Sequence, residues 1–310
     1  MARIRTPARH LPSLLLVAFL GGGACSAGSS GAEIAPLVQA EAAAAVSSAA
    51  ASGEPQSIDC AGNPRALWEA EASIQHRDGD ELHQYWLLAD QPDLWDTVVP
   101  VFESLTRYRE QVRKILPDTS PLGLIRSNRR LNSWLEREYP AEGRISRLVE
   151  AGVGWHRPMN CLESHLLAYQ AARFPLYEQP SEIVALIVKR SEVSGDLGDL
   201  VKVYIAADDD AIVPKPNWAI ESVEIDVAEG WRFHAVFHNH TFDHSDERSL
   251  VPVAAPSASD LEVSVALNER LGLEYVLVTD GFSTLELTPE EFRKLERAAR
   301  STGESDQVAK

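Results

Sequence analysis

The segment 233–240, FHAVFHNH, constrains the fold most, because a short apolar run ends in a paired H-x-H. Its length and its Phe, Val and Ala content predict a largely buried β-strand. Side chains in a strand alternate between faces, so His238 and His240 project from one face and Asn239 from the other. His234 shares the face of the histidine pair but lies farther along the strand. The two imidazoles at the end of the strand can therefore converge on one cation.

A second segment, PSASD at 256–260, opens a predicted helix over 257–271 that ends at Gly272. Ser257 stands three residues before Asp260, which is a spacing that caps a helix N-terminus. Taken alone, this pair is best interpreted as a cap. Beside a strand that ends in two histidines, the same carboxylate becomes a candidate third ligand.

Two histidines and one carboxylate are the ligand set of a catalytic zinc site rather than of a structural one. Structural zinc sites use four protein ligands, often cysteines, whereas catalytic sites use three and leave one position open. No cysteine lies within this motif. The sequence thus predicts one Zn²⁺ ion held by His238, His240 and Asp260.

These residues resemble the signature of the JAMM metalloproteases, also called MPN+ or Mov34-type: an upstream Glu, H-x-H-P, a spacer and S-x-x-D. The resemblance covers residues 175–300, and the flanks agree with it, since a strand leads into the histidines and the strand EYVLVTD follows the helix. It implies that His238, His240 and Asp260 bind zinc. It also implies that the Ser257 hydroxyl stabilises the tetrahedral intermediate.

The family also uses a Glu near the start of an early strand to move a proton from the attacking water to the leaving amine. Glu182 stands at the head of the apolar strand EIVALIVKR, 56 residues before His238. Glu178 and Glu163 are alternatives, and Glu163 lies on a predicted helix where a solvated or capping role competes. Glu182 is preferred because only it begins a strand that could run beside the histidine strand.

The sequence departs from the family pattern in two places. Thr241 replaces the usual Pro after the second histidine, and the spacer between His240 and Ser257 is longer than usual. This spacer is predicted to form a surface loop over the site, and its Asp243 and His244 are competing candidates for metal ligands. Such a loop is a natural place for substrate selection.

The rest of the chain predicts an α+β (mixed α/β) fold, with a JAMM-like twisted sheet flanked by helices. Further strands are expected over 183–188, 201–206, 223–227 and 275–278, and further helices over 161–173 and from Thr288 to near Gly303. These elements make up a predicted domain over 161–303, followed by a tail over 304–310. Residues 61–160 carry helical periodicity and are predicted to form a helical N-terminal region.

The first 24 residues are typical of an export signal. Arg3, Arg5 and Arg9 precede the short apolar run LLLVAFL, which is too short to span a bilayer. Small residues then lead to Cys25, which resembles a bacterial lipoprotein cleavage site with Cys25 as the lipidated residue; ordinary signal-peptidase cleavage is the alternative. Residues 25–60 are rich in Ala, Ser and Gly and predict a tether.

Two cysteines remain beyond this leader, Cys60 and Cys161. In an oxidising periplasm such a pair is a candidate disulfide, with two separate buried thiols as the alternative. The formal net charge is −17, and no Lys/Arg cluster marks a nucleic-acid surface. The string HNH at 238–240 therefore does not indicate an HNH nuclease, whose named residues are dispersed along the chain.

The sequence thus predicts an exported zinc hydrolase, anchored to the membrane only through lipid, that cleaves a peptide or isopeptide bond. Its expected partner is a peptide, protein or small amide-conjugate substrate, and not a nucleic acid. One alternative keeps the fold without catalysis, as a metal-binding or scaffold lipoprotein. Another is a metal-sequestering lipoprotein, whose metal binding should not change in a Glu182→Gln variant.

Overall fold

The computed structural model describes residues 60, 74–78, 81–97, 101–131, 133, 135–191, 199–207, 216–243 and 251–301 of the 310-residue chain. All of them lie in the unit Glu41–Lys310. The predicted export signal over 1–24, Cys25, the tether before Cys60, His244 and the tail over 304–310 lie outside the described residues.

The centre of the structure is one mixed β-sheet of eight described strands, in the order β1-β2-β5-β4-β6-β7-β8-β3. The strands are β1 (Ile74–Asp78), β2 (Glu81–Ala89), β3 (Trp155–Arg157), β4 (Ile183–Arg190), β5 (Leu200–Ala207), β6 (Arg232–Asn239), β7 (Tyr275–Thr279) and β8 (Thr284–Leu287). Strands β6 and β7 run parallel, and every other neighbouring pair in this sheet is antiparallel.

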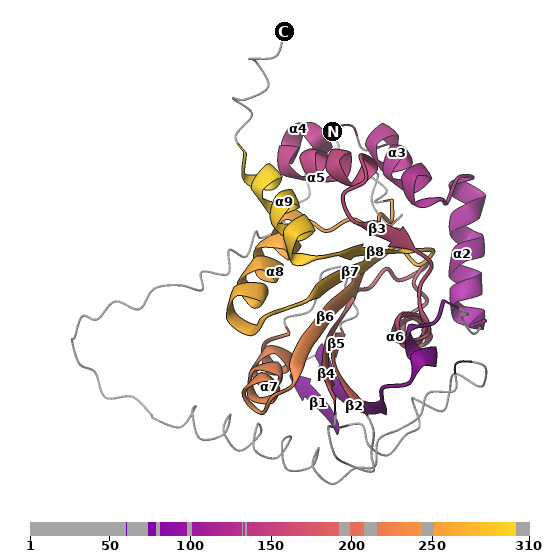
Figure 1. Cartoon of the computed structure of the whole chain (residues 1–310). Coiled ribbons are helices and arrows are strands. Elements are labelled where there is room, and N and C mark those ends of the chain that lie inside the picture. The colour runs from indigo at the N-terminus through magenta and orange to yellow at the C-terminus, as the bar shows by residue number, and fades with distance from the viewer. Residues whose placement is uncertain are drawn as a thin grey trace, which may run out of the picture. The chain divides into compact units, whose positions relative to one another are not determined.

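Helices cover both faces of the sheet, so the fold is α+β. The helices are η2 (Pro92–Trp95), α2 (Glu103–Ile115), α3 (Pro121–Leu131), α4 (Leu135–Glu138), α5 (Pro140–Glu150), α6 (Cys161–Arg173), α7 (Asn217–Ala228), α8 (Ala258–Leu271) and α9 (Pro289–Arg300). Helices α7, α8 and α9 lie on one side of the sheet and α6 on the other (Figure 1). Each face has its own apolar cluster.

The strands and helices predicted around the histidine segment are present. Strands β4, β5 and β7 cover the segments expected at 183–188, 201–206 and 275–278, and β6 covers the segment expected at 233–240 except its last residue, His240. Helix α8 begins after Ser257 and ends at Gly272, which adopts the left-handed conformation (φ 73°) expected of a C-terminal glycine. Helix α9 begins after Thr288, and α6 matches its predicted range.

The strand predicted at 223–227 is wrong, because this segment lies within helix α7. The buried residues of α7 are Ala219, Ser222, Val223 and Asp226. Their spacing of three and four residues is the period of a helix, which the short alternation V-E-I-D-V conceals. The segment 223–227 is helical because it continues the helix that begins at Asn217.

The prediction that 61–160 is helical is wrong for the segments that form β1, β2 and β3. Strand β2 lies between β1 and β5 in the sheet, and its residues 84–88 are buried. Tyr85 and Leu87 join the apolar cluster of one face, and Trp86 and Leu88 that of the other. A strand apolar on both sides has no polar alternation to identify it. The predicted N-terminal region over 61–160 and the predicted domain over 161–303 thus contribute strands to the same sheet.

The parallel pair β6–β7 places the end of the histidine strand beside a helix start. The chain leaves β6, passes into α8 and returns as β7, which is a strand–helix–strand crossover. In such units the helix begins near the carboxyl end of the first strand, where ligands commonly bind. The topology therefore brings Asp260, in the first turn of α8, close to His238 and His240.

A disulfide joins Cys60 to Cys161, the first residue of α6. It ties a segment before the sheet to a helix that packs in the apolar cluster of one face. Within the described residues, no helix has the length and apolar character needed to cross a membrane.

We expect the disulfide to contribute about 2–4 kcal/mol to the free energy of unfolding, because it closes a long loop in the unfolded chain. In a Cys25→Ser background, Cys60→Ser/Cys161→Ser should lower the midpoint of urea unfolding accordingly. Thiol titration of the denatured, unreduced Cys25→Ser protein should detect no free thiol. Two reactive thiols in that titration would contradict the assignment.

Candidate metal centre

Strand β6 presents His238 and Asn239 to opposite faces of the sheet. His238 pairs with Val184 of β4 and Val278 of β7, whose side chains belong to the cluster that also contains residues of α8. The His238 side chain is buried, with 3% exposure. It therefore faces the first turn of α8, as the strand alternation predicts.

His240 lies just beyond the end of β6 and is fixed by two hydrogen bonds. Its backbone N–H donates to the Thr279 carbonyl over 2.8 Å, which continues the β6–β7 ladder. Its ring Nδ1 lies 3.0 Å from the Val253 carbonyl. A proton on Nδ1 makes this contact a hydrogen bond and leaves the lone pair on Nε2, which faces Asp260. Metal-binding histidines are commonly oriented by a bond of this kind.

Asp260 belongs to a capping box at the start of α8. Its backbone N–H donates to Ser257 Oγ over 3.2 Å, and its Oδ2 accepts the Ser257 N–H over 2.7 Å. The helix-cap interpretation of these two residues is therefore correct. The same carboxylate oxygen also faces both histidines, so capping does not remove Asp260 from the site.

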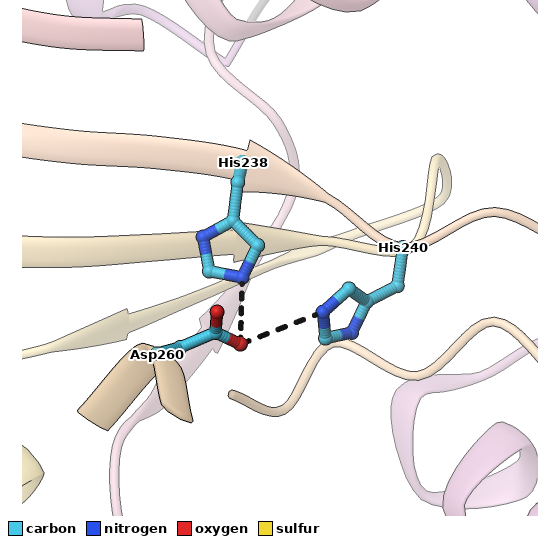
Figure 2. Close-up of side chains that lie close together, drawn as sticks. All are labelled: His238, His240 and Asp260. Atoms are coloured by element: carbon cyan, nitrogen blue, oxygen red, sulfur yellow. Dashed lines mark ion pairs between the residues drawn. The ribbon is translucent and has the colours of Figure 1, made fainter. Parts of the chain in front are cut away.

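The three side chains converge, as Figure 2 shows. Oδ2 of Asp260 lies 3.3 Å from Nε2 of His238 and 3.7 Å from Nε2 of His240. One ligand atom from each residue lies within 4.8 Å of the other two. Two ligands about 2.0–2.1 Å from a tetrahedral zinc lie about 3.3–3.4 Å apart. The Asp260 oxygen thus lies from each imidazole at a distance near this spacing, and the three donor atoms together lie within 4.8 Å of one another.

A buried polar atom supports this fit. Nε2 of His238 is buried and forms no hydrogen bond with any described residue, although Asp260 lies 3.3 Å away. An unsatisfied buried ring nitrogen costs about 1–3 kcal/mol, and such atoms are rare without a functional reason. A metal ligand needs this nitrogen to present a lone pair rather than a proton.

The electrostatics describe the site without a metal. Burial lowers the pKa of His240, but its ion pair with Asp260 and the charge of Glu182 outweigh burial and raise the pKa to about 9. Burial raises the pKa of Asp260, but His238 and His240 outweigh it and hold that pKa well below its usual range. Without a metal, a proton on His240 therefore occupies this cluster at neutral pH.

Glu182 lies close enough to His240 for its charge to affect that imidazole. It directly precedes β4, whose first residue is held by Asn239. The Asn239 side-chain oxygen accepts the Ile183 N–H over 2.8 Å, and its amide donates to the Ser181 carbonyl over 3.0 Å. Asn239 thus fixes both neighbours of Glu182 from the face of β6 opposite the histidines.

The two alternative glutamates are engaged elsewhere. The buried Glu163 carboxylate caps α6 and accepts hydrogen bonds from Arg157, Asn160 and Thr284. Glu178 is exposed and accepts a hydrogen bond from Gln111 over 2.9 Å. Neither belongs to the ligand cluster.

The other predicted residues of the site differ in their placement. Ser257 Oγ lies 2.8 Å from Ser259 Oγ, at the start of α8 beside Asp260. Asp243 is outside the ligand cluster, which is the only such group among the described residues.

Glu142 is a site residue that sequence reasoning missed. It lies in the first turn of α5, outside the segment that resembles the family signature. Its Oε1 accepts the Ala258 N–H over 3.0 Å, and the charges of Asp260 and His240 both affect it. The segment PAEGRISRLVE carries no chemical motif, so only the packing of α5 against α8 identifies this residue.

Comparison with protein-family models, with curated proteins and with solved structures gives no match.

We expect Asn239→Ala to lower the free energy of unfolding by about 1–3 kcal/mol, because the Ile183 N–H and the Ser181 carbonyl lose the hydrogen bonds that Asn239 forms with them. Hydrogen exchange should show faster exchange of the Ile183 amide. Asn268→Ala is the matched control, because its amide caps the far end of α8 by donating to the Leu273 carbonyl. It should reduce stability without affecting Ile183, and equal exchange in both variants would contradict the assignment.

Proposed function

We propose that this chain is a zinc-dependent hydrolase of the JAMM type that cleaves an amide bond, either a peptide or an isopeptide bond. One observation carries the proposal: the ligand atoms of His238, His240 and Asp260 lie within 4.8 Å of one another. Two imidazoles and a carboxylate suit zinc and supply three of the four ligands of a catalytic site. Zinc bound there would polarise the substrate carbonyl and lower the pKa of a water molecule.

Glu182 is proposed as the acid/base. It would accept a proton from the attacking water and deliver it to the leaving nitrogen, so that the amine departs neutral. Its effect on His240 supports this role, because the carboxylate must lie near the ligands without being one of them. Asn239 and the Gln170 side-chain amide, which lies 3.3 Å from the Glu182 carbonyl, hold its backbone.

Ser257 is proposed to stabilise the oxyanion that forms on the substrate. Its hydroxyl oxygen already accepts the Asp260 N–H, so its proton remains available for donation. The proton can point to Ser259 Oγ in the resting state and to substrate during the reaction. Such a preorganised donor stabilises developing negative charge.

The proposed setting is outside the cytoplasm, with Cys25 as a lipid anchor. The disulfide between Cys60 and Cys161 supports this setting, because disulfides persist in oxidising compartments. Substrates there would be peptides, proteins or small amide conjugates. The long segment between His240 and Ser257 is proposed to select among them.

The purified protein should bind about one zinc ion per chain, as metal analysis and zinc titration would show. His240→Ala and Asp260→Ala should each remove tight binding because two protein ligands remain. The affinity should rise with pH up to about 9, because zinc must displace a proton from His240. A wild-type protein without stoichiometric zinc would refute the metal centre.

Glu182→Gln should keep zinc but reduce kcat by about 10²–10⁴-fold in a screen of peptide and isopeptide substrates, because the proton acceptor is lost. Glu178→Gln is the matched control, since this nearby acid is exposed and bonded to Gln111. It should hydrolyse like wild type. Zinc binding with no hydrolysis of any substrate would favour the metal-binding or scaffold alternative. Equal hydrolysis by wild type and Glu182→Gln would refute the role of Glu182.

A further inference from the structure

Helix α5 reaches the candidate metal centre through one carboxylate. Glu142 lies in the first turn of α5 and accepts the backbone N–H of Ala258, the first residue of α8, over 3.0 Å. This N–H is one of the first-turn donors that have no partner inside a helix. Glu142 therefore joins two helices through residues that are 116 positions apart in the chain, and it does so two residues before Asp260.

The ligands are held by different parts of the structure. His238 and His240 are fixed by the β6–β7 ladder, including the bond from His240 N–H to Thr279. Apart from its ion pairs with the two histidines, the Asp260 carboxylate is held within its own turn, by the Ser257 N–H. A movement of that turn would carry the carboxylate away from the imidazoles without breaking the cap. The distance between Asp260 and the histidines thus depends on what anchors the start of α8 to the rest of the fold.

We propose that Glu142 is a positioning residue that anchors the first turn of α8 and so sets the distance of the Asp260 carboxylate from His238 and His240. This inference rests on the proposed zinc site and assigns a role within it to the region before the family-like segment. Helix α5 is itself held by apolar packing, because its buried Ile145 and Val149 belong to the cluster that also contains Phe292 of α9.

The hydrogen-bond acceptor, rather than the charge, is what positioning requires. Glu142→Gln keeps a side-chain oxygen that can accept the Ala258 N–H, whereas Glu142→Ala removes it. We expect zinc affinity to fall by about 10–100-fold in Glu142→Ala, as is typical when a partner of a metal ligand is lost. Glu142→Gln should remain close to wild type. Competition titration with a chromophoric chelator would measure both affinities.

The absorption spectrum of Co²⁺ bound in place of zinc gives a second measurement of the site that does not depend on activity. The visible absorption of Co²⁺ in Glu142→Ala should differ from wild type if the Asp260 carboxylate moves, and Glu142→Gln should restore it. Arg144→Ala is the matched control, because it removes the α5–α9 bonds from the same helix. It should lower the thermal stability of the metal-free protein while leaving the zinc affinity near that of wild type.

Three outcomes would overturn the proposal while wild type still binds zinc. These are wild-type affinity in Glu142→Ala, equal weakening in Glu142→Gln and Glu142→Ala, and weakening in Arg144→Ala as large as in Glu142→Ala. The second would assign the role to charge, and the third to the docking of α5 alone. Absence of zinc from wild type would instead refute the proposed function and this inference with it.

Discussion

The arrangement of the site depends on the hydrogen bonds of Asn239, the residue between the two histidines. Its side chain is 1% exposed and bonds on both sides of Glu182, to Ser181 and Ile183. Strand alternation sends Asn239 to one face of β6 and the histidines to the other. This short segment therefore positions groups on both faces of the sheet. Both imidazoles face the first turn of α8, and the Asn239 side chain holds the start of β4 beside β6.

The parallel pair β6–β7 supplies the other constraint. A crossover helix between parallel strands must begin near the carboxyl end of the first strand, so Asp260 comes to the histidines by topology. The 17-residue step from His240 to Ser257 leaves this outcome unchanged, because the strand and the helix start fix both ends of the segment. Residues 251–256 of this segment are buried, and the Val253 carbonyl lies 3.0 Å from His240 Nδ1, so the spacer also helps to orient a ligand of the site.

The sequence was sufficient to predict residues whose roles follow from local pattern. Alternation along β6 predicted the shared face of His238 and His240, and the capping spacing predicted that α8 starts at Ser257 with Asp260 in its first turn. Local pattern could not reveal β2, because a strand buried on both faces has no polar alternation. Nor could it reveal Glu142, whose role arises from the docking of α5 on a helix far along the chain.

The two interpretations of Asp260, helix cap and metal ligand, reinforce each other. The start of a helix carries a partial positive charge, which repels a divalent cation near the helix end. Asp260 lies between the helix start and the histidines, and Glu142 accepts an N–H of the same turn. Together they neutralise the helix end while one carboxylate oxygen, which has lone pairs to spare, faces the imidazoles. This arrangement would let a cation occupy a position that the bare helix would disfavour, as the proposed metal centre requires.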